Sequence, residues 1–253
     1  MLNNPTIDKL KSLKLTGMAM AFEEQLKTPG QDLDFESRLA ILVEQEWITR
    51  ENRKLKRRLT QAKLHQPACI EDIIYSPDRG ISRTKIMELA HLQWLQHKMN
   101  LLITGATGCG KTYLACALAH KACLNGFTSR YYRLTRLWEV FKIAKASGTY
   151  AQLLSQIAKI DVLILDDWGL IRPEKERIQD LLEMLDDRYK NRSTIITSQI
   201  PISCWHEYLE DPTLADAILD RLVHNAEKIT LTGPTMRDEA NRKSSLQNEP
   251  SIE

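Results

Sequence analysis

Apolar residues recur with a helical period in the first part of the chain, whereas the rest alternates between short apolar runs and helical segments. From Ile7 to Leu26, apolar residues recur at helical spacing up to a break at Pro29-Gly30. Asp34 is a candidate N-cap for a second helix, whose apolar positions continue to Leu59. Residues 1–75 are therefore predicted to form a small all-helical N-terminal domain.

From residue 76 to 235, short apolar runs alternate with segments of helical period. The runs predict strands over 100–104, 129–134, 161–166, 193–198 and 227–231, and helices are predicted near 111–125, 135–158, 174–191 and 213–225. Continuous apolar runs are typical of strands buried on both faces, so the alternation predicts an α/β fold with a central parallel sheet. Residues 236–253 are polar and are expected to form a frayed tail.

The apolar run that ends at Thr104 is followed directly by the pattern G-x-x-x-x-G-K-T. Its glycines allow successive N–H groups to point at an anion, and the helix that follows adds its positive end. Lys111 is predicted to reach the β- and γ-phosphates of ATP, and the Thr112 hydroxyl to bind Mg²⁺. A chance match is the alternative, but the preceding strand and following helix favour a phosphate-binding loop. The predicted nucleotide contacts are Gly105, Ala106, Thr107, Gly108, Cys109, Gly110, Lys111, Thr112 and Tyr113.

A second motif, the run Val162–Leu165 followed by Asp166 and Asp167, places two carboxylates at the end of a predicted buried strand. Ligands of open α/β sheets bind at this end of the strands. Asp166 is predicted to hold Mg²⁺ through water, and Asp167 to orient or deprotonate the attacking water. An ordinary strand end with an acidic turn is the alternative. A position about fifty residues after a phosphate-binding loop favours the catalytic interpretation.

Two polar residues complete the predicted catalytic set of Lys111, Asp167, Gln199 and Arg221. Gln199 follows a strand expected beside that of Asp166, where it can touch the γ-phosphate or the water; a loop residue before Pro201 is the alternative. Arg221 lies just ahead of the last strand, where it can stabilise transition-state charge at the nucleotide of the next subunit. Its alternative is a surface salt bridge with Asp216 or Asp220.

Charge is nearly balanced over the 253 residues, with 35 Lys and Arg against 33 Asp and Glu, so net charge does not indicate nucleic-acid binding. It is concentrated locally, because seven basic residues lie between Arg50 and Lys63 against the single acid Glu51. Both a solvated helix face and a surface that follows DNA phosphates fit this run. The candidate DNA contacts are Arg50, Arg53, Lys54, Arg57 and Arg58.

Other sequence features bear on the cellular compartment, on membrane contact and on metal binding. Five cysteines without a C-x-x-C pair indicate a reducing cytoplasm, and Cys116 and Cys123 are expected to be buried. No apolar run approaches the ~20 residues of a membrane span, so no membrane partner is expected. The histidines are scattered, without metal-ligand spacing.

Four motifs occur in the order found in AAA+ ATPases: Gly105–Thr112, Asp166–Gly169, Thr197–Pro201 and Asp220–Leu222. Their form resembles the DnaC-like helicase-loader branch. A narrower resemblance is to IstB-like proteins, the ATP-binding helper proteins of insertion-sequence transposons. It rests on Leu13–Met18, Glu51–Leu59, Arg79–Arg83 and Ala217–Ala226. It covers about residues 5–240, and the N-terminal segments are not general ATPase features.

The resemblance implies an ATPase that binds duplex DNA as a homo-oligomer and works with a transposase. By position, Lys111 and Thr112 match Walker A, Asp166 and Asp167 match Walker B, Gln199 matches sensor 1 and Arg221 matches the arginine finger. Two features depart from the common AAA+ pattern. Walker B ends Asp-Asp rather than Asp-Glu, and the helical lid is nearly absent, which leaves Arg237 as a candidate sensor 2.

The sequence thus predicts an ATP-dependent transposition helper that oligomerises on target DNA and hydrolyses ATP to ADP and phosphate. A DnaC-like helicase loader in DNA replication is the alternative, and it differs in its N-terminal contacts. A small-molecule P-loop kinase would leave the run Arg50–Lys63 unexplained, and a non-hydrolysing DNA scaffold would leave Asp167 idle. Turnover with and without DNA discriminates among these.

Overall fold

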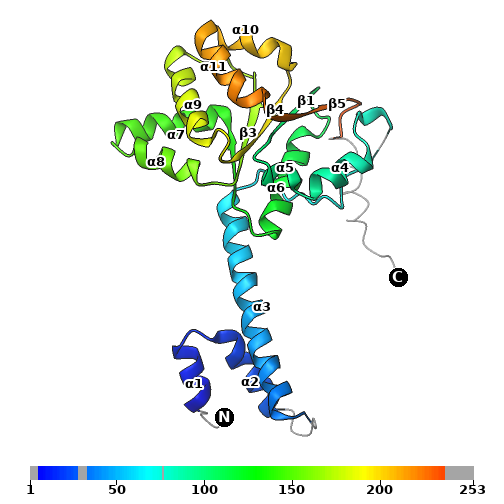
Figure 1. The fold of residues 1–253 in the computed structure, drawn as a ribbon, viewed down its shortest axis with the longest axis vertical. Helices are drawn as coiled ribbons and strands as arrows, with labels where there is room; N and C mark the ends of the chain where they lie inside the picture. The colour runs from blue at the N-terminus through cyan, green and yellow to red at the C-terminus, as the bar shows by residue number, and fades with distance from the viewer. Residues whose placement is uncertain (1–4, 28–32, 76, 237–253) are drawn as a thin grey trace, which may run out of the picture. The chain divides into compact units, whose positions relative to one another are not determined.

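The computed structural model describes residues 5–27, 33–75 and 77–236 (Figure 1). Contacts divide the chain into two units: a helical unit, residues 1–60, and a sheet unit, residues 61–253. The predicted domain boundary at residue 75 stays a prediction. The frayed tail and Arg237 lie outside the described residues. No helix in the described ranges is both long and apolar enough to cross a membrane.

The helical unit contains α1 (Pro5–Ser12), α2 (Thr16–Lys27) and most of α3 (Phe35–Ala62). Where the sequence predicts one apolar helical stripe, the structure has two helices, because Lys14 adopts a left-handed backbone with φ 60°. The amides of Lys14 and Leu15 bond back to α1 carbonyls, which closes that helix with a Schellman motif. Asp34 accepts the Ser37 amide at 2.8 Å, so the predicted N-cap of α3 is confirmed. The Pro29-Gly30 break lies outside the described residues.

Helices α2 and α3 pack through a small contact rather than a large apolar core. Among the described residues of this unit, the buried apolar side chains are Ala19 and Ala21. A Cβ on Gly17 would lie 2.5 Å from the Gln45 carbonyl oxygen of α3, so this close approach requires glycine. The Glu46 carboxylate of α3 accepts the amides of Gly17 at 2.7 Å and Met18 at 3.2 Å. It therefore caps the N-terminus of α2 from outside that helix.

The sheet unit is built on five parallel strands in the order β2-β3-β4-β1-β5. Their bounds are β1 (Asn100–Gly105), β2 (Ser129–Arg133), β3 (Val162–Trp168), β4 (Ser193–Ser198) and β5 (Ala226–Leu231). All five predicted strands are confirmed to within two residues at each end. The predicted parallel sheet is also confirmed, and its order places β4 between β3 and β1.

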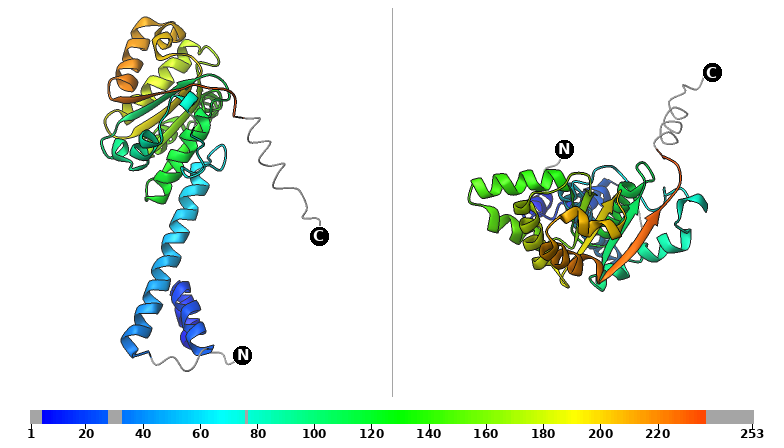
Figure 2. Two further views of the ribbon diagram at one scale, coloured as in Figure 1. Left: turned by 90° about the vertical axis from the view of Figure 1, so that its right-hand side faces the viewer. Right: turned by 90° about the horizontal axis from the view of Figure 1, so that it is seen from above.

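Helices cover both faces of this sheet, as the two views of Figure 2 show. One face packs on α4 (Arg83–Ala90), α5 (Gln93–Gln96) and α6 (Lys111–Leu124). The other packs on α7 (Leu134–Ala146), α8 (Tyr150–Ala158), α9 (Lys175–Arg188), α10 (Trp205–Leu209) and α11 (Pro212–Val223). Successive β1 residues alternate between the two cores, with Leu101 and Ile103 in the first and Leu102 in the second. Cys116 and Cys123 are buried, as predicted.

The helix predicted over 135–158 is wrong as a single element. It is two helices, α7 and α8, because the chain turns at Ser147–Thr149. Gly148 has φ 69°, and the amide of Thr149 bonds back to the Ala144 carbonyl at 2.8 Å. Both features close α7 before α8 begins.

Candidate nucleotide-binding site

The predicted phosphate-binding loop lies where β1 ends and α6 begins. Gly105 and Gly110 have φ of 149° and 93°, in the region that favours glycine. A Cβ at Gly105 would lie 2.2 Å from the Leu231 carbonyl oxygen of β5. Because α6 starts at Lys111, its N-terminal amides and positive dipole end face the loop. This is a strand–loop–helix arrangement suited to binding an anion.

Lys111 is 8% exposed, and its ammonium group lies inside the loop. It donates to the carbonyl oxygens of Gly105 at 2.9 Å and Ala106 at 2.8 Å. The cation is thus held within the curve of the loop. Tyr113, the last predicted contact, turns its hydroxyl away from the loop to the backbone of Cys69.

Asp166 is the centre of a group of hydroxyls from three elements, and it is 2% exposed. Its carboxylate accepts the Thr112 hydroxyl of α6 at 3.0 and 3.1 Å and the Tyr131 hydroxyl of β2 at 2.5 Å. The Thr197 hydroxyl of β4 donates to it as well. The structure therefore brings Asp166 and Thr112, the two predicted Mg²⁺ ligands, into contact. A carboxylate beside a hydroxyl fits Mg²⁺, which prefers oxygen ligands and keeps several waters.

A bulge in β3 places Asp167 next to Asp166 at the same edge of the sheet. The register between β3 and β4 shifts between Leu165 and Trp168, and Asp167 has a φ of 62°. Bulges of this kind re-aim side chains beside active sites. Burial, and then the Asp166 carboxylate, raise the pKa of Asp167. Arg133 of β2 opposes this rise, because its Nε lies 3.5 Å from Asp167 Oδ2.

Gln199 follows β4 directly and reaches the phosphate-binding loop. Its Oε1 accepts the Thr107 hydroxyl at 2.7 Å. Of the predicted catalytic set, Lys111, Asp167 and Gln199 therefore lie together at the carboxyl edge of the sheet, at the ends of β1, β3 and β4.

Arg79 lies at this site, although no motif in the sequence marks it as a nucleotide-site residue. Arg79 is 8% exposed. Its guanidinium donates to the Cys109 carbonyl at 3.0 Å and to the Ile74 carbonyl, and it lies against Gly110. This side chain is therefore held against the phosphate-binding loop.

Two residues after β5 also form backbone hydrogen bonds to this site. The Thr232 amide bonds to the Arg79 carbonyl at 3.0 Å, and the Met236 amide bonds to the Gly108 carbonyl at 2.9 Å. No sequence motif marked these contacts. They arise because β5 lies beside β1 in the sheet.

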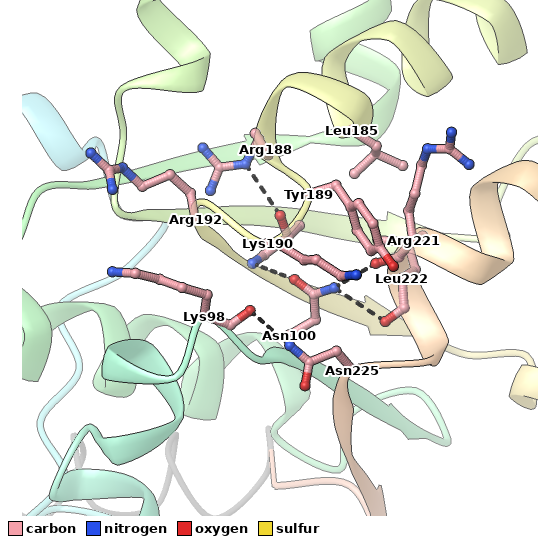
Figure 3. A pocket seen from close by; sticks show the side chains of 11 residues that line it. Lys98, Asn100, Leu185, Arg188, Tyr189, Lys190, Arg192, Arg221, Leu222 and Asn225 are labelled. Atoms are coloured by element: carbon pink, nitrogen blue, oxygen red, sulfur yellow. Dashed lines mark hydrogen bonds between the residues drawn. The ribbon is translucent and has the colours of Figure 1, made fainter.

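Arg221 lies away from this group, at the amino edge of the sheet. It forms an ion pair with Asp186 of α9, rather than with Asp216 or Asp220 as the alternative interpretation expected. It borders an open depression, which we call the amino-edge depression (Figure 3). The basic residues that line it are Lys98, Arg188, Lys190, Arg192 and Arg221. Asn100, at the start of β1, holds the end of α11 there by donating to the carbonyls of Arg221 and Leu222.

The candidate DNA contacts lie on α3. Arg50, Arg53, Lys54 and Arg57 follow the i, i+3, i+4, i+7 spacing of one helix face, and Arg58 is four residues beyond Lys54. Some of this charge is paired locally. Arg50 bonds to Glu46 at 2.7 Å, Lys54 to Glu51 at 2.8 Å, and Arg53 donates to the Thr16 hydroxyl.

The strand order, the loop and the Asp166 group define an AAA+ P-loop nucleotide-binding protein. Solved structures agree with this fold. DnaI matches with a TM-score of 0.56 and 25% identity, over 67% of this chain and 96% of that chain. AMPPCP-bound DnaA from Aquifex aeolicus matches with the same TM-score and 15% identity, over 76% of this chain and 58% of that chain.

The chain belongs to the IstB-like ATP binding protein family, whose model matches residues 8–244. An insertion-sequence ATP-binding protein of Sinorhizobium fredii is 47% identical over 96% of this chain and all of its own length. A protein from the insertion sequence IS21 of Pseudomonas aeruginosa, also named as ATP-binding, is 32% identical over 94% of this chain and 90% of its own. The resemblance inferred from the sequence is therefore confirmed.

Proposed function

We propose that this protein is an ATPase that assembles on target DNA and works with the transposase of an insertion sequence. The observation that carries the catalytic part is the contact between the Thr112 hydroxyl and both carboxylate oxygens of Asp166, beside Lys111 and Asp167. The relatives named as insertion-sequence ATP-binding proteins support the partnership with a transposase.

The site residues divide the chemistry of ATP hydrolysis among themselves. Lys111 and the loop amides bind the phosphates, and Thr112 with Asp166 would hold a Mg²⁺ ion. That ion would neutralise charge on the phosphate oxygens. Asp167 accepts a proton from, or orients, the attacking water, and Gln199 reaches the γ-phosphate side of the loop. The Arg133 contact supports this role, because a nearby cation favours the ionised carboxylate that a base requires.

Arg221 is proposed to act on the nucleotide of a second copy. It is separated from its own loop by the length of β1, whose six residues span about 20 Å. Completion of the site by a neighbouring copy makes hydrolysis depend on assembly.

The basic face of α3 is proposed to contact the DNA backbone. Its exposed basic side chains follow one face over two helical turns, a spacing suited to successive phosphates. Assembly multiplies such weak contacts, because each copy adds one basic face.

Steady-state ATP turnover of the full chain, with and without duplex DNA, tests the proposal. We expect Lys111→Ala to abolish nucleotide binding and turnover, and Asp167→Asn to keep binding but slow turnover by about 100-fold or more. Lys142→Gln, an exposed lysine of α7, is the matched control and should turn over normally. Unchanged turnover in Asp167→Asn would remove this residue from the mechanism, and phosphate transfer to a small molecule without DNA stimulation would favour a kinase.

A further inference from the structure

Two cations share one aromatic ring beside the amino-edge depression. Lys190 Nζ lies 4.9 Å from the centre of the Tyr189 ring, and Arg221 Cζ lies 6.0 Å from it. Figure 3 shows Arg221 and Tyr189 on one side of the depression, with the charged ends of Lys98 and Arg192 on the other. Lys190 is exposed and has a left-handed backbone, with φ 56°, in the turn that follows α9.

Carboxylates pair with two of the five cations that line the depression: Asp161 Oδ1 lies 3.4 Å from Arg192 Nε, and Asp186 pairs with Arg221. No carboxylate is among the described residues that line the depression. Arg188, which is 1% exposed, donates to three backbone carbonyls and the Thr194 hydroxyl. Burial lowers the pKa of Arg188 to about 9, and the charge of Arg192 adds to this effect. A concave surface with clustered cations attracts an anion from another molecule.

Arg221 already binds an oxyanion in the single chain. Its Nε bonds to the Asp186 carboxylate, while Nη1 donates to the Ala217 carbonyl at 2.6 Å. A guanidinium binds phosphate with the same geometry as carboxylate. A terminal phosphate, with a charge of about −1.5 to −2, competes well with a carboxylate that is 47% exposed.

A phosphate that binds Arg221 at this depression must come from a second molecule. The depression adjoins Asn100, where β1 starts, and Thr194 near the start of β4, whereas the chain's own loop follows the end of β1. Duplex DNA spreads its charges along a convex surface, with one per ≈ 1.7 Å of helix axis. The end of a nucleotide's phosphate chain concentrates charge at one point, so it matches this local cluster of cations better than a duplex does.

We propose that Lys190 is a second contact, beside Arg221, for the terminal phosphate of a nucleotide held by a second copy of this chain. The inference rests on the proposed trans role of Arg221. Both cations lie near the Tyr189 ring, and the phosphate takes the place of the Asp186 carboxylate on the guanidinium.

Sedimentation of the full chain tests this with Lys190→Gln, Arg221→Gln and the control Lys142→Gln. The measured quantity is the protein concentration at half-assembly, with a non-hydrolysable ATP analogue or with ADP. We expect Lys190→Gln to raise it about tenfold with the triphosphate and to leave it unchanged with ADP. Nucleotide affinity of the dilute, unassembled chain should match that of the control.

Asp186→Asn supplies the opposite perturbation. Loss of the competing carboxylate should lower the half-assembly concentration with the triphosphate, while a matched change at the exposed neighbour Asp187 should not.

The outcomes separate the inference from the function on which it rests. Normal assembly of Lys190→Gln with defective assembly of Arg221→Gln overturns the role of Lys190 and keeps the trans finger. Normal assembly and turnover of both variants overturns the trans finger itself. Weaker DNA binding by unassembled Lys190→Gln without nucleotide would assign the phosphate to DNA and overturn the inference.

Discussion

Arg79→Gln tests whether the phosphate-binding loop is shaped before nucleotide arrives. The guanidinium holds the Cys109 carbonyl at 3.0 Å and is almost fully buried against Gly110. A hydrogen bond from a charged donor contributes about 1.5–3 kcal/mol. Glutamine keeps part of the stem but withdraws the donor, so we expect about 2 kcal/mol to be lost from nucleotide binding. This corresponds to about 30-fold in affinity.

Equilibrium titration with a fluorescent adenine nucleotide, at concentrations where the chain is unassembled, measures the effect. Arg83→Gln is the matched control, because Arg83 is exposed and four residues away. Thermal unfolding of both variants shows whether the fold is retained. If Arg79→Gln lowers the melting temperature but binds nucleotide within about twofold of the control, Arg79 joins segments of the core and does not shape the loop.

Three further predictions concern the helical unit. Glu46→Gln should speed hydrogen exchange of the α2 amides, while Glu51→Gln on the same helix should not. Burial alone would raise the pKa of Glu46, but its hydrogen bonds lower it below the ordinary 4.5. The stabilisation from ionised Glu46 is therefore fully present above about pH 4.5 and is lost as pH falls through the lower pKa of the folded state. The exchange rates of Glu46→Gln and of the unchanged protein should therefore become equal in acid. Gly17→Ala should separate α2 from α3 and raise exchange in both, because its Cβ would clash with α3 backbone. Changing Arg57 and Arg58 together to Ala should weaken DNA binding equally for all DNA sequences. The slope of the logarithm of the binding constant against the logarithm of salt concentration should become shallower by about 0.9 per lost phosphate contact. An unchanged slope would mean that DNA binds to another surface.

The five strands could be predicted because burial on both faces leaves continuous apolar runs, and the breaks between helices could not. Lys14 adopts a left-handed conformation at the end of α1. Lysine rarely adopts this conformation, so the sequence gives no signal that the helix ends there. Gly148 was a visible signal for the end of α7, because glycine favours the positive φ that it adopts there, but the prediction of a single helix gave it no weight. Helices such as α5, with four residues, contain too few turns for a period to be seen.

In the candidate site too, features formed by consecutive residues could be predicted, whereas contacts between distant segments could not. The phosphate-binding loop is read from the sequence because its chemistry resides in consecutive backbone amides. Tyr131 and Thr197 meet Asp166 only because β2 and β4 flank β3, and no spacing in the sequence encodes that order. Arg79 reaches the loop from a segment before β1 for a similar reason.

The bulge at the end of β3 explains how two consecutive aspartates can serve one site. In a regular strand, neighbouring side chains point to opposite faces, so Asp167 would turn away from Asp166. The register shift and the φ of 62° at Asp167 remove this alternation. A left-handed aspartate is strained, and such strain persists only where the surroundings fix it. Trp168 is fully buried, and its carbonyl accepts the Ser198 hydroxyl at 2.9 Å, so the chain on the far side of the bulge is held in place. The backbone therefore brings the short carboxylate of Asp167 to the phosphate edge.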